Sequence, residues 1–228
     1  MPIGAVRFGL IGSNGATTSL VDDDNTEFLL IADQGKIDVS GNYALSEVGS
    51  VLVENIGISK KGLNSTQSFS FNSSNNYFKF GTSINPIYGI GDFTIESWVY
   101  FDSSYSGLSQ RYVFTTKAGG PQPGLELAIF GVELSAGVAP NSYQKTIIFP
   151  QNEWVFLAFS RKSGAGYLYV NSTLSDTGIN SGNNTGGGTE QPSIGNRTAD
   201  PSFYLGGKIA ELRISNVARY DNVNSPVL

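Results

Sequence analysis

Carboxylates, tyrosines and asparagines are the side chains in this 228-residue sequence that could do chemistry, because it contains no histidine and no cysteine. Without histidine there is no imidazole base for a Ser-His-Asp triad and no histidine-ligated zinc. Without cysteine there is no thiol nucleophile, no thiolate metal site and no disulfide framework. Two possibilities remain: hydrolysis by a pair of acids, and recognition of a ligand by aromatic, hydroxyl and amide groups.

Two glutamates, Glu96 and Glu211, lie in strand-like segments beside aromatic or basic residues. A glycosidase needs two carboxyl groups on either side of one bond, about 5 Å apart for retention and about 6.5–9.5 Å apart for inversion. The sequence supplies neither glutamate with a second acid, and a single buried carboxylate must be compensated by a partner. We interpret both as structural groups paired with Arg213 or Arg219. Arg219 and the following Tyr220 are interpreted as a structural clamp.

A glycan site would need aromatic faces and amide or hydroxyl groups on one rim of the molecule. Candidate residues of these types lie in predicted loops: Tyr88, Tyr105, Tyr143, Tyr204, Asn141, Asn180 and Asn183. Loops rich in tyrosine and asparagine suit recognition because they provide contact area at a low entropic cost. They suit contacts between protein subunits equally well, so glycan and protein ligands both stay open.

The charge and hydropathy of the chain exclude other partners. Charged residues make up 14% of the sequence, and the formal net charge is −5. An acidic chain does not suit the nucleic-acid backbone, so we expect no nucleic-acid partner. No apolar run reaches the ~18 residues that a membrane helix requires, and residues 1–13 lack the basic start of a secretory signal. We therefore expect no membrane insertion and no signal peptide.

The elements that position these residues are predicted to be strands. The sequence holds 28 glycines, 28 serines, 19 asparagines and 27 aromatic residues, which favours many short strands joined by turns. No segment of ten or more residues has a helical period. Strand-like runs are Phe93–Phe101, Tyr112–Thr116, Leu125–Phe130, Thr146–Phe149, Trp154–Ser160, Tyr167–Asn171 and Lys208–Ile214. The run from Trp154 is apolar on both faces, as in the central strand of a two-layer sandwich.

Composition changes near residue 62. Residues 1–62 hold three aromatic residues and a net charge of −4, whereas the remaining residues hold 24 aromatic residues. Short strand-like runs in the first part are Ala5–Leu10, Glu27–Ile31, Lys36–Val39 and Val51–Ile56. We predict that residues 1–62 are a docking or assembly segment that packs on the main domain, residues 63–228, or on another chain. The run Asp22-Asp23-Asp24 is interpreted as a solvated loop and not as a metal site.

Three pieces of the sequence carry a resemblance to a known family: Asp92–Val99 (DFTIESWV), Asn152–Asn171 (NEWVFLAFSRKSGAGYLYVN) and Phe203–Tyr220 (FYLGGKIAELRISNVARY). In this order they resemble a first long strand, a central hairpin and a closing strand. From about Gln67 to Tyr220 the chain resembles the laminin-G-like, concanavalin A-like lectin/glucanase superfamily. The form is the compact one frequent in bacteriophage virion proteins and bacterial surface proteins.

The resemblance implies an all-β, antiparallel jelly-roll β-sandwich, here with an N-terminal β-rich extension. Members of the family bind glycans or proteins, act as virion or adhesin modules, or occasionally hydrolyse glycans, and the fold alone does not choose among these. Catalytic relatives carry a Glu-x-Asp-x-Glu string on one strand, and this string is absent here. Calcium is common among relatives, but Ala210 stands where they usually have an acid. We expect no enzyme activity and no cofactor, with calcium the one ion that the resemblance brings up.

Our leading hypothesis is a non-enzymatic bacteriophage virion structural protein, either a head decoration or a fibre or spike component. It would be made in the host cytoplasm, lie at the virion surface, form a homo-oligomer and contact other virion proteins through residues 1–62. The alternative is a carbohydrate-binding lectin or adhesin, extracellular or at a cell surface, that recognises host surface glycans. A glycan hydrolase is the third hypothesis.

Overall fold

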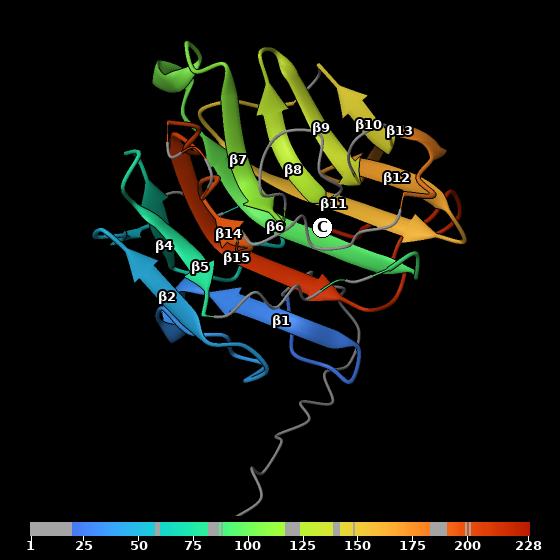
Figure 1. Ribbon diagram of the computed structural model, residues 1–228, viewed down its shortest axis with the longest axis horizontal. Coiled ribbons are helices and arrows are strands. Elements are labelled where there is room, and N and C mark those ends of the chain that lie inside the picture. Colours follow the sequence, from blue (N-terminus) through green and yellow to red (C-terminus); the bar gives the residue numbers. More distant parts are fainter. Residues whose placement is uncertain are drawn as a thin grey trace, which may run out of the picture.

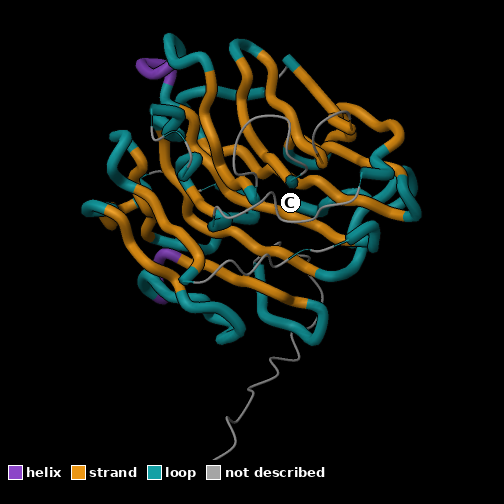
Figure 2. The backbone as a smooth tube through the Cα atoms, in the orientation of Figure 1, coloured by secondary structure: helices purple, strands orange, loops and turns teal. Residues whose placement is uncertain are grey.

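The structure, a computed structural model, describes residues 20–57, 60–81, 87, 89–116, 124–138, 142–147, 149–182, 191–198, 200 and 202–228. Short strands joined by loops make up most of it, with single-turn 3-10 helices at Ala32–Gln34 and Ser103–Tyr105 (Figure 2). The strands form two antiparallel sheets, which confirms the predicted all-β jelly-roll sandwich (Figure 1). No helix in these ranges is long and apolar enough to cross a membrane.

The first sheet, sheet I, has the strand order β13-β12-β11-β6-β15-β4-β3, and β1 pairs with β15 beside this path. The strands are β1 Thr26–Ile31, β3 Leu52–Asn55, β4 Gln67–Phe71, β6 Phe93–Phe101, β11 Trp154–Lys162, β12 Ala165–Val170, β13 Thr173–Ile179 and β15 Gly207–Ser215. One edge of β15 pairs with two strands: its first residues pair with β4, and its last residues pair with β1. It therefore connects β6 to two strands from early in the sequence.

The second sheet, sheet II, has the strand order β10-β9-β8-β7-β14-β5-β2. The strands are β2 Leu45–Val48, β5 Tyr77–Phe80, β7 Gln110–Thr115, β8 Leu125–Phe130, β9 Glu133–Val138, β10 Ser142–Thr146 and β14 Ser193–Ile194. Four consecutive strands, β7 to β10, are neighbours, whereas β14, β5 and β2 come from distant parts of the sequence.

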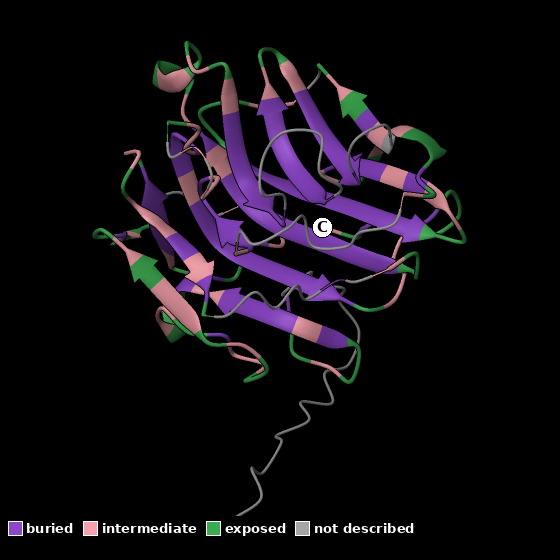
Figure 3. Cartoon of the chain, in the orientation of Figure 1, coloured by how far each residue is buried: buried purple, intermediate pink, exposed green. Residues whose placement is uncertain are grey.

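The main core lies between the sheets. Alternation along β6 points Phe93, Ile95 and Val99 into it, and each is 0% exposed. Figure 3 shows the middle of the long strands buried and the strand ends and loops exposed. Burial of one face of each sheet is the main stabilising contribution, at about 25 cal/mol per Å² of apolar surface.

Sheet I is also covered on its outer face. In β11, Val155 belongs to the main core and Phe156 to a second apolar cluster on the outer face. Leu20 and Leu63 lie in this second cluster, and Tyr220 packs against it. Residues from both ends of the described chain thus shield the outer face, and this explains why the run from Trp154 is apolar on both faces.

The described part of the N-terminal segment is built into the sandwich. β1 pairs with β15, β3 with β4, and β2 with β5. Phe28 and Leu30 of β1 are 0% exposed and belong to the main core. Its strands β1, β2 and β3 therefore belong to the same two sheets as strands from residues 63–228. The run Ala5–Leu10 lies outside the described residues.

The run Lys36–Val39 was predicted as a strand, but the structure has turns there. The reason is the buried carboxylate of Asp38, which accepts hydrogen bonds from the backbone N–H of Leu29, Ser40, Asn42 and Tyr43 at 2.9–3.0 Å. Four donors on one side chain hold the backbone in a compact loop that cannot extend into a ladder. The prediction failed because this local network competes with strand pairing.

Candidate functional site

The register of sheet I brings five residues into one row across five strands, at the end where β6 finishes. Trp154 of β11 lies opposite Tyr100 of β6, and Tyr100 lies opposite Lys208 of β15. Lys208 lies opposite Ser70 of β4, and Ser70 lies opposite Leu52 of β3. We call these five residues the Tyr100 row. With strands about 4.8 Å apart, four steps give a row about 19 Å long.

Two depressions lie on the Tyr100 row and share Tyr100. The Lys60 depression has a volume of about 240 Å³ and is lined by Ile56, Lys60, Tyr100, Asn152, Glu153 and Trp154. The Lys208 depression has a volume of about 160 Å³ and is lined by Glu54, Ser70, Asn72, Tyr100, Asp102, Tyr105, Gly207 and Lys208. A third, wider depression of about 600 Å³ adjoins the first through Glu153 and is lined by Ile147, Phe149, Pro150, Glu153, Val170, Asn171, Thr173 and Ser175. We call the first two depressions, which meet at Tyr100, the groove.

An ion pair lies in each depression of the groove. Lys60 Nζ lies 2.5 Å from Glu153 Oε2, and Lys208 Nζ lies 2.5 Å from Glu54 Oε2. All four side chains are 34–52% exposed, so each pair contributes at most about 1 kcal/mol to stability. Each ammonium and carboxylate keeps hydrogen-bonding capacity beyond its partner, which a ligand could use.

Tyr105 is fixed at one side of the groove. Asp102 Oδ1 accepts hydrogen bonds from the Ser104 hydroxyl at 2.7 Å and the Ser104 N–H at 2.8 Å, and these lower the pKa of Asp102. The Tyr105 ring packs edge-on against Tyr204, with centroids 5.8 Å apart. Gly206 has φ +58°, and a Cβ there would lie 2.4 Å from Tyr105 Cβ, so only glycine lets the ring approach.

Asn152 is fixed on the opposite side, in the left-handed conformation at φ 59°. Its Oδ1 accepts a hydrogen bond from Ser103 N–H at 2.9 Å, and its Nδ2 donates to Ser103 Oγ at 2.8 Å. Ser103 lies in the same short helix as Tyr105. Asn152 of the Lys60 depression is thus connected through Ser103 to the short helix that carries Tyr105 of the Lys208 depression.

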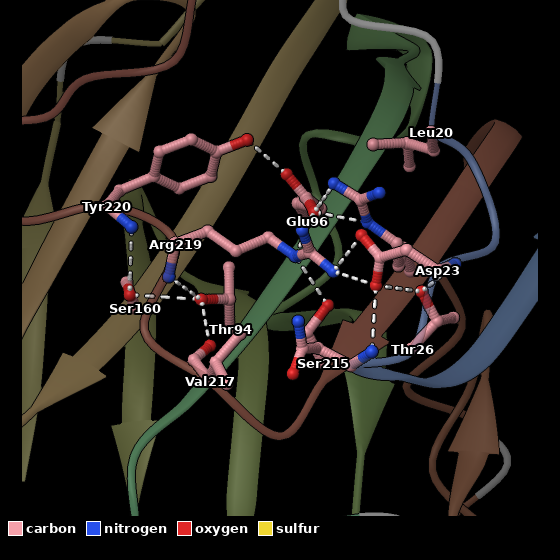
Figure 4. A network of polar contacts seen from close by, with 12 residues as sticks. Leu20, Asp23, Thr26, Thr94, Glu96, Ser160, Ser215, Val217, Arg219 and Tyr220 are labelled. Atoms are coloured by element: carbon pink, nitrogen blue, oxygen red, sulfur yellow. Dashed lines mark hydrogen bonds and ion pairs between the residues drawn. The ribbon is translucent and has the colours of Figure 1, made fainter. Parts of the chain in front are cut away.

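Glu96 has a structural role. Its carboxylate is 0% exposed and lies 2.5–2.6 Å from the Arg213 guanidinium, as cross-strand pairing of Arg213 with Glu96 requires. Tyr220 OH donates to Glu96 Oε2 at 2.5 Å, and Arg219 lies 3.7 Å from Oε1. Arg219 also donates to both carboxylate oxygens of Asp23, at 2.7 and 2.8 Å (Figure 4). The expected pairing of Glu96 with arginines is present, and Asp23 of the acidic run takes part in it.

Glu211 was expected to pair with an arginine, but in the described part of the chain it has no arginine partner. Arg213 is taken up by Glu96 on the neighbouring strand. Glu211 instead accepts hydrogen bonds from Ser65 Oγ at 2.7 Å, Ser65 N–H at 3.1 Å and Leu20 N–H at 3.4 Å. Burial raises the pKa of Glu211, which is 2% exposed. It is closed off from any ligand in the groove.

The other candidate ligand residues have different places. Tyr143 donates its hydroxyl to Glu126 on the outer face of sheet II, reaching across Gly137 of β9. Asn180 is 0% exposed, and its amide donates to Gln144 Oε1 at 3.2 Å, so it is a buried structural residue. Tyr105 lines the groove and Tyr204 supports it. The remaining candidates, Tyr88, Asn141 and Asn183, lie outside the described residues.

The main groove residues were missed at the level of sequence. Tyr100, Trp154 and Lys208 lie in strands, and the search for ligand residues was restricted to loops. One signal was present: alternation in the run Phe93–Phe101 already placed Tyr100 on the face opposite Phe93, near the strand end. The positions of Trp154 and Lys208 beside Tyr100 depend on the register of β11, β6 and β15.

The groove contains two carboxylates in one depression, Glu54 and Asp102. A glycosidase needs one acid with a raised pKa, whereas the pKa of Asp102 is lowered and Glu54 is held by Lys208. Glu211, the described carboxylate whose pKa is raised, is closed off.

The described residues contain no group of three or more acidic side chains that could hold a metal. Ala210, at the position where relatives usually have an acid, is 0% exposed in the second apolar cluster.

Comparison with solved structures shows the same fold in a domain of an arabinanase and in binding domains of toxins. Domain 4 of AbnA, a GH43 extracellular arabinanase from Geobacillus stearothermophilus, solved with arabinotriose, is 18% identical, with TM-score 0.65, covering 85% of this chain and 93% of that one. The binding domain of Paraclostridial Mosquitocidal Protein 1 is 17% identical, with TM-score 0.60, covering 86% of this chain and 49% of that one. The binding domain of botulinum neurotoxin DC, in complex with rat synaptotagmin II, is 15% identical, with TM-score 0.57, covering 90% of this chain and 50% of that one.

The chain thus spans about half the length of these toxin binding domains. No curated protein matches it. The model of one family matches residues 72–222, which include β6, β11 and β15, the strands on which the resemblance was based. Those strands also supply Tyr100, Trp154 and Lys208 of the groove. From the family match, the chain belongs to the concanavalin A-like lectin/glucanases superfamily.

Proposed function

We propose that the protein is a non-enzymatic carbohydrate-binding module, and that the groove over the Tyr100 row holds the glycan. One observation carries the proposal: the register of sheet I gathers Trp154, Tyr100 and Lys208 beside Tyr105, so that aromatic rings and charged groups line one groove. Sites for small ligands combine apolar lining with a few fixed polar groups, and this groove has that composition.

The chemistry of the lining suits a sugar. Tyr100 and Tyr105 offer partly exposed rings against which the apolar face of a sugar can pack. The amides of Asn72 and Asn152 offer both donors and acceptors to hydroxyl groups. The arabinanase domain solved with arabinotriose has the same fold, which supports a glycan as the ligand class.

A glycan array with the purified protein tests this proposal, followed by titration of the strongest ligand. Tyr100→Ala and Tyr105→Ala should each weaken binding at least about tenfold, since each removes a ring worth about 1.4 kcal/mol of contact. Tyr143→Ala is the matched control, because Tyr143 is a partly buried tyrosine of sheet II outside the groove. No saturable glycan binding, or equal losses in all three variants, would reject the groove as the site.

The virion role is a second proposal, and its support comes from the sequence: the acidic, aromatic-poor residues 1–62 and the resemblance to virion modules. Residues 20–57 supply β1, β2 and β3, so a docking segment that can be removed without unfolding the sandwich is restricted to residues 1–19. Deleting residues 1–19 should leave a folded protein that no longer joins the particle. Unimpaired incorporation of the shortened chain into particles would contradict docking through this segment.

A further inference from the structure

The two depressions of the groove have matching chemistry. Each contains one lysine–glutamate pair with an N–O distance of 2.5 Å, Lys60 with Glu153 in one and Lys208 with Glu54 in the other. Each also contains one asparagine, Asn152 in the first and Asn72 in the second. A lysine–glutamate pair and an asparagine are therefore present in each depression, and the Lys208 depression adds Ser70, Asp102 and Tyr105.

Tyr100 lies between these two sets and belongs to both depressions. Its register partners are Trp154 on one side and Lys208 on the other, so Tyr100 stands between these two residues of the row. The ring packs edge-on against Trp154, with centroids 5.8 Å apart. From Trp154 to Lys208 is two strand spacings, about 10 Å, which is longer than a single sugar ring.

The charges of the groove are nearly balanced. The Lys60–Glu153 pair is neutral as a unit, and the Lys208–Glu54 pair is neutral apart from the nearby carboxylate of Asp102. No described lysine in the groove is left without a carboxylate partner. Each lysine already has a glutamate beside it, so an anionic sugar would lie near Glu153, or near Glu54 and Asp102, and like charges repel.

We propose, resting on the proposed glycan function, that the groove binds a neutral linear oligosaccharide that crosses the strands of sheet I, with one sugar unit on either side of Tyr100. Two linked units bind together more tightly than either alone, because the second contact becomes intramolecular once the first has formed. The groove therefore selects chain length, and an isolated monosaccharide fills only half of it.

The test is a titration of the full chain by calorimetry with arabinose and arabinotriose, with glucose and cellotriose, and with trigalacturonate as the acidic probe. A neutral trisaccharide should bind on the order of tenfold or more tightly than its own monosaccharide, and trigalacturonate should bind more weakly than the neutral trisaccharide. Glu153→Gln and Asn72→Ala each alter one depression, and each should reduce the preference for the trisaccharide. Tyr100→Ala should weaken both the monosaccharide and the trisaccharide.

The outcomes separate this inference from the function on which it rests. Equal affinity for a monosaccharide and its trisaccharide would overturn the two-unit groove and leave glycan binding intact. If only one of Glu153→Gln and Asn72→Ala reduced the preference for the trisaccharide, the groove would hold a single sugar unit, and the inference would be overturned. Tighter binding of trigalacturonate would overturn the preference for neutral chains. No binding of any of these sugars, together with a blank glycan array, would overturn the proposed function itself.

Discussion

Substitution of Glu96 by glutamine gives the sharpest test of the structural role assigned to this carboxylate. Glutamine keeps the shape of the side chain but removes its charge. The Arg213 guanidinium, whose side chain is 7% exposed, would lose the ion pair at 2.5 Å that compensates its burial. Removing one partner of a buried ion pair costs about 3–5 kcal/mol, because the other charge stays in a medium of low polarity.

The structure offers a control with the same distance and different burial. Glu54 lies 2.5 Å from Lys208, but the two side chains are 35% and 34% exposed. Exposed pairs contribute about 0–1 kcal/mol, so Glu54→Gln should change the free energy of unfolding by less than about 1 kcal/mol. Burial, and not the distance between the charges, should decide the size of the effect.

Denaturant unfolding followed by circular dichroism measures both variants, and thermal unfolding gives a second readout. For a chain of this size, about 2–4 °C are lost per kcal/mol, so Glu96→Gln should lower the melting temperature by about 6–20 °C. The double variant Glu96→Leu with Arg213→Met should recover most of this loss, since it removes both charges together. A loss below about 1 kcal/mol for Glu96→Gln would refute the structural assignment and return this carboxylate to the candidates for catalysis.

Three further predictions concern single residues. Burial raises the pKa of Glu211 above its ordinary value of 4.5, so the stabilisation from its protonation is complete below pH 4.5 and is lost as pH rises. When unfolding is measured at several pH values, the free energy of unfolding of Glu211→Gln should increase relative to that of the wild type as the pH rises above 4.5. Gly206→Ala should displace Tyr105 and weaken glycan binding in the titration, although no groove side chain is removed. Asp38→Ala should cost about 3 kcal/mol or more in denaturant unfolding, since four backbone donors lose their acceptor.

The fold could be predicted from the sequence where each strand carries its own signal. Alternation in β6 and the two-sided apolar run of β11 identify their places without reference to other strands. The first 62 residues were harder, because β1 and β3 are short and find their places only through partners more than a hundred residues away or across a turn. Nothing within the run Glu27–Ile31 indicates that it will pair with the last half of β15.

The candidate site could be predicted only in part, for the same reason. Tyr105 was identified because a tyrosine in a loop is a recognisable feature, and Tyr204 beside it likewise. Apart from the pairing of Ser70 with Leu52, the Tyr100 row depends on register between strands that are about fifty residues or more apart in the sequence. One-residue shifts would turn its side chains to the opposite face. Asn180 is the opposite case, a loop residue predicted as a ligand contact that has a structural place. It lies in a polar segment of the sequence, but in the fold its side chain is buried beside β10 and β12.

The central place of β15 has a consequence for how the protein is made. This strand leaves the ribosome after all the other strands, yet it is the direct neighbour of β6, β4 and β1. Until it emerges, the edges of β6, β4 and β1 that pair with β15 have no partner, and unpaired edges invite association with other chains. We expect nascent chains that end before Gly207 to stay aggregation-prone and bound to chaperones, and the sandwich to close in one late step.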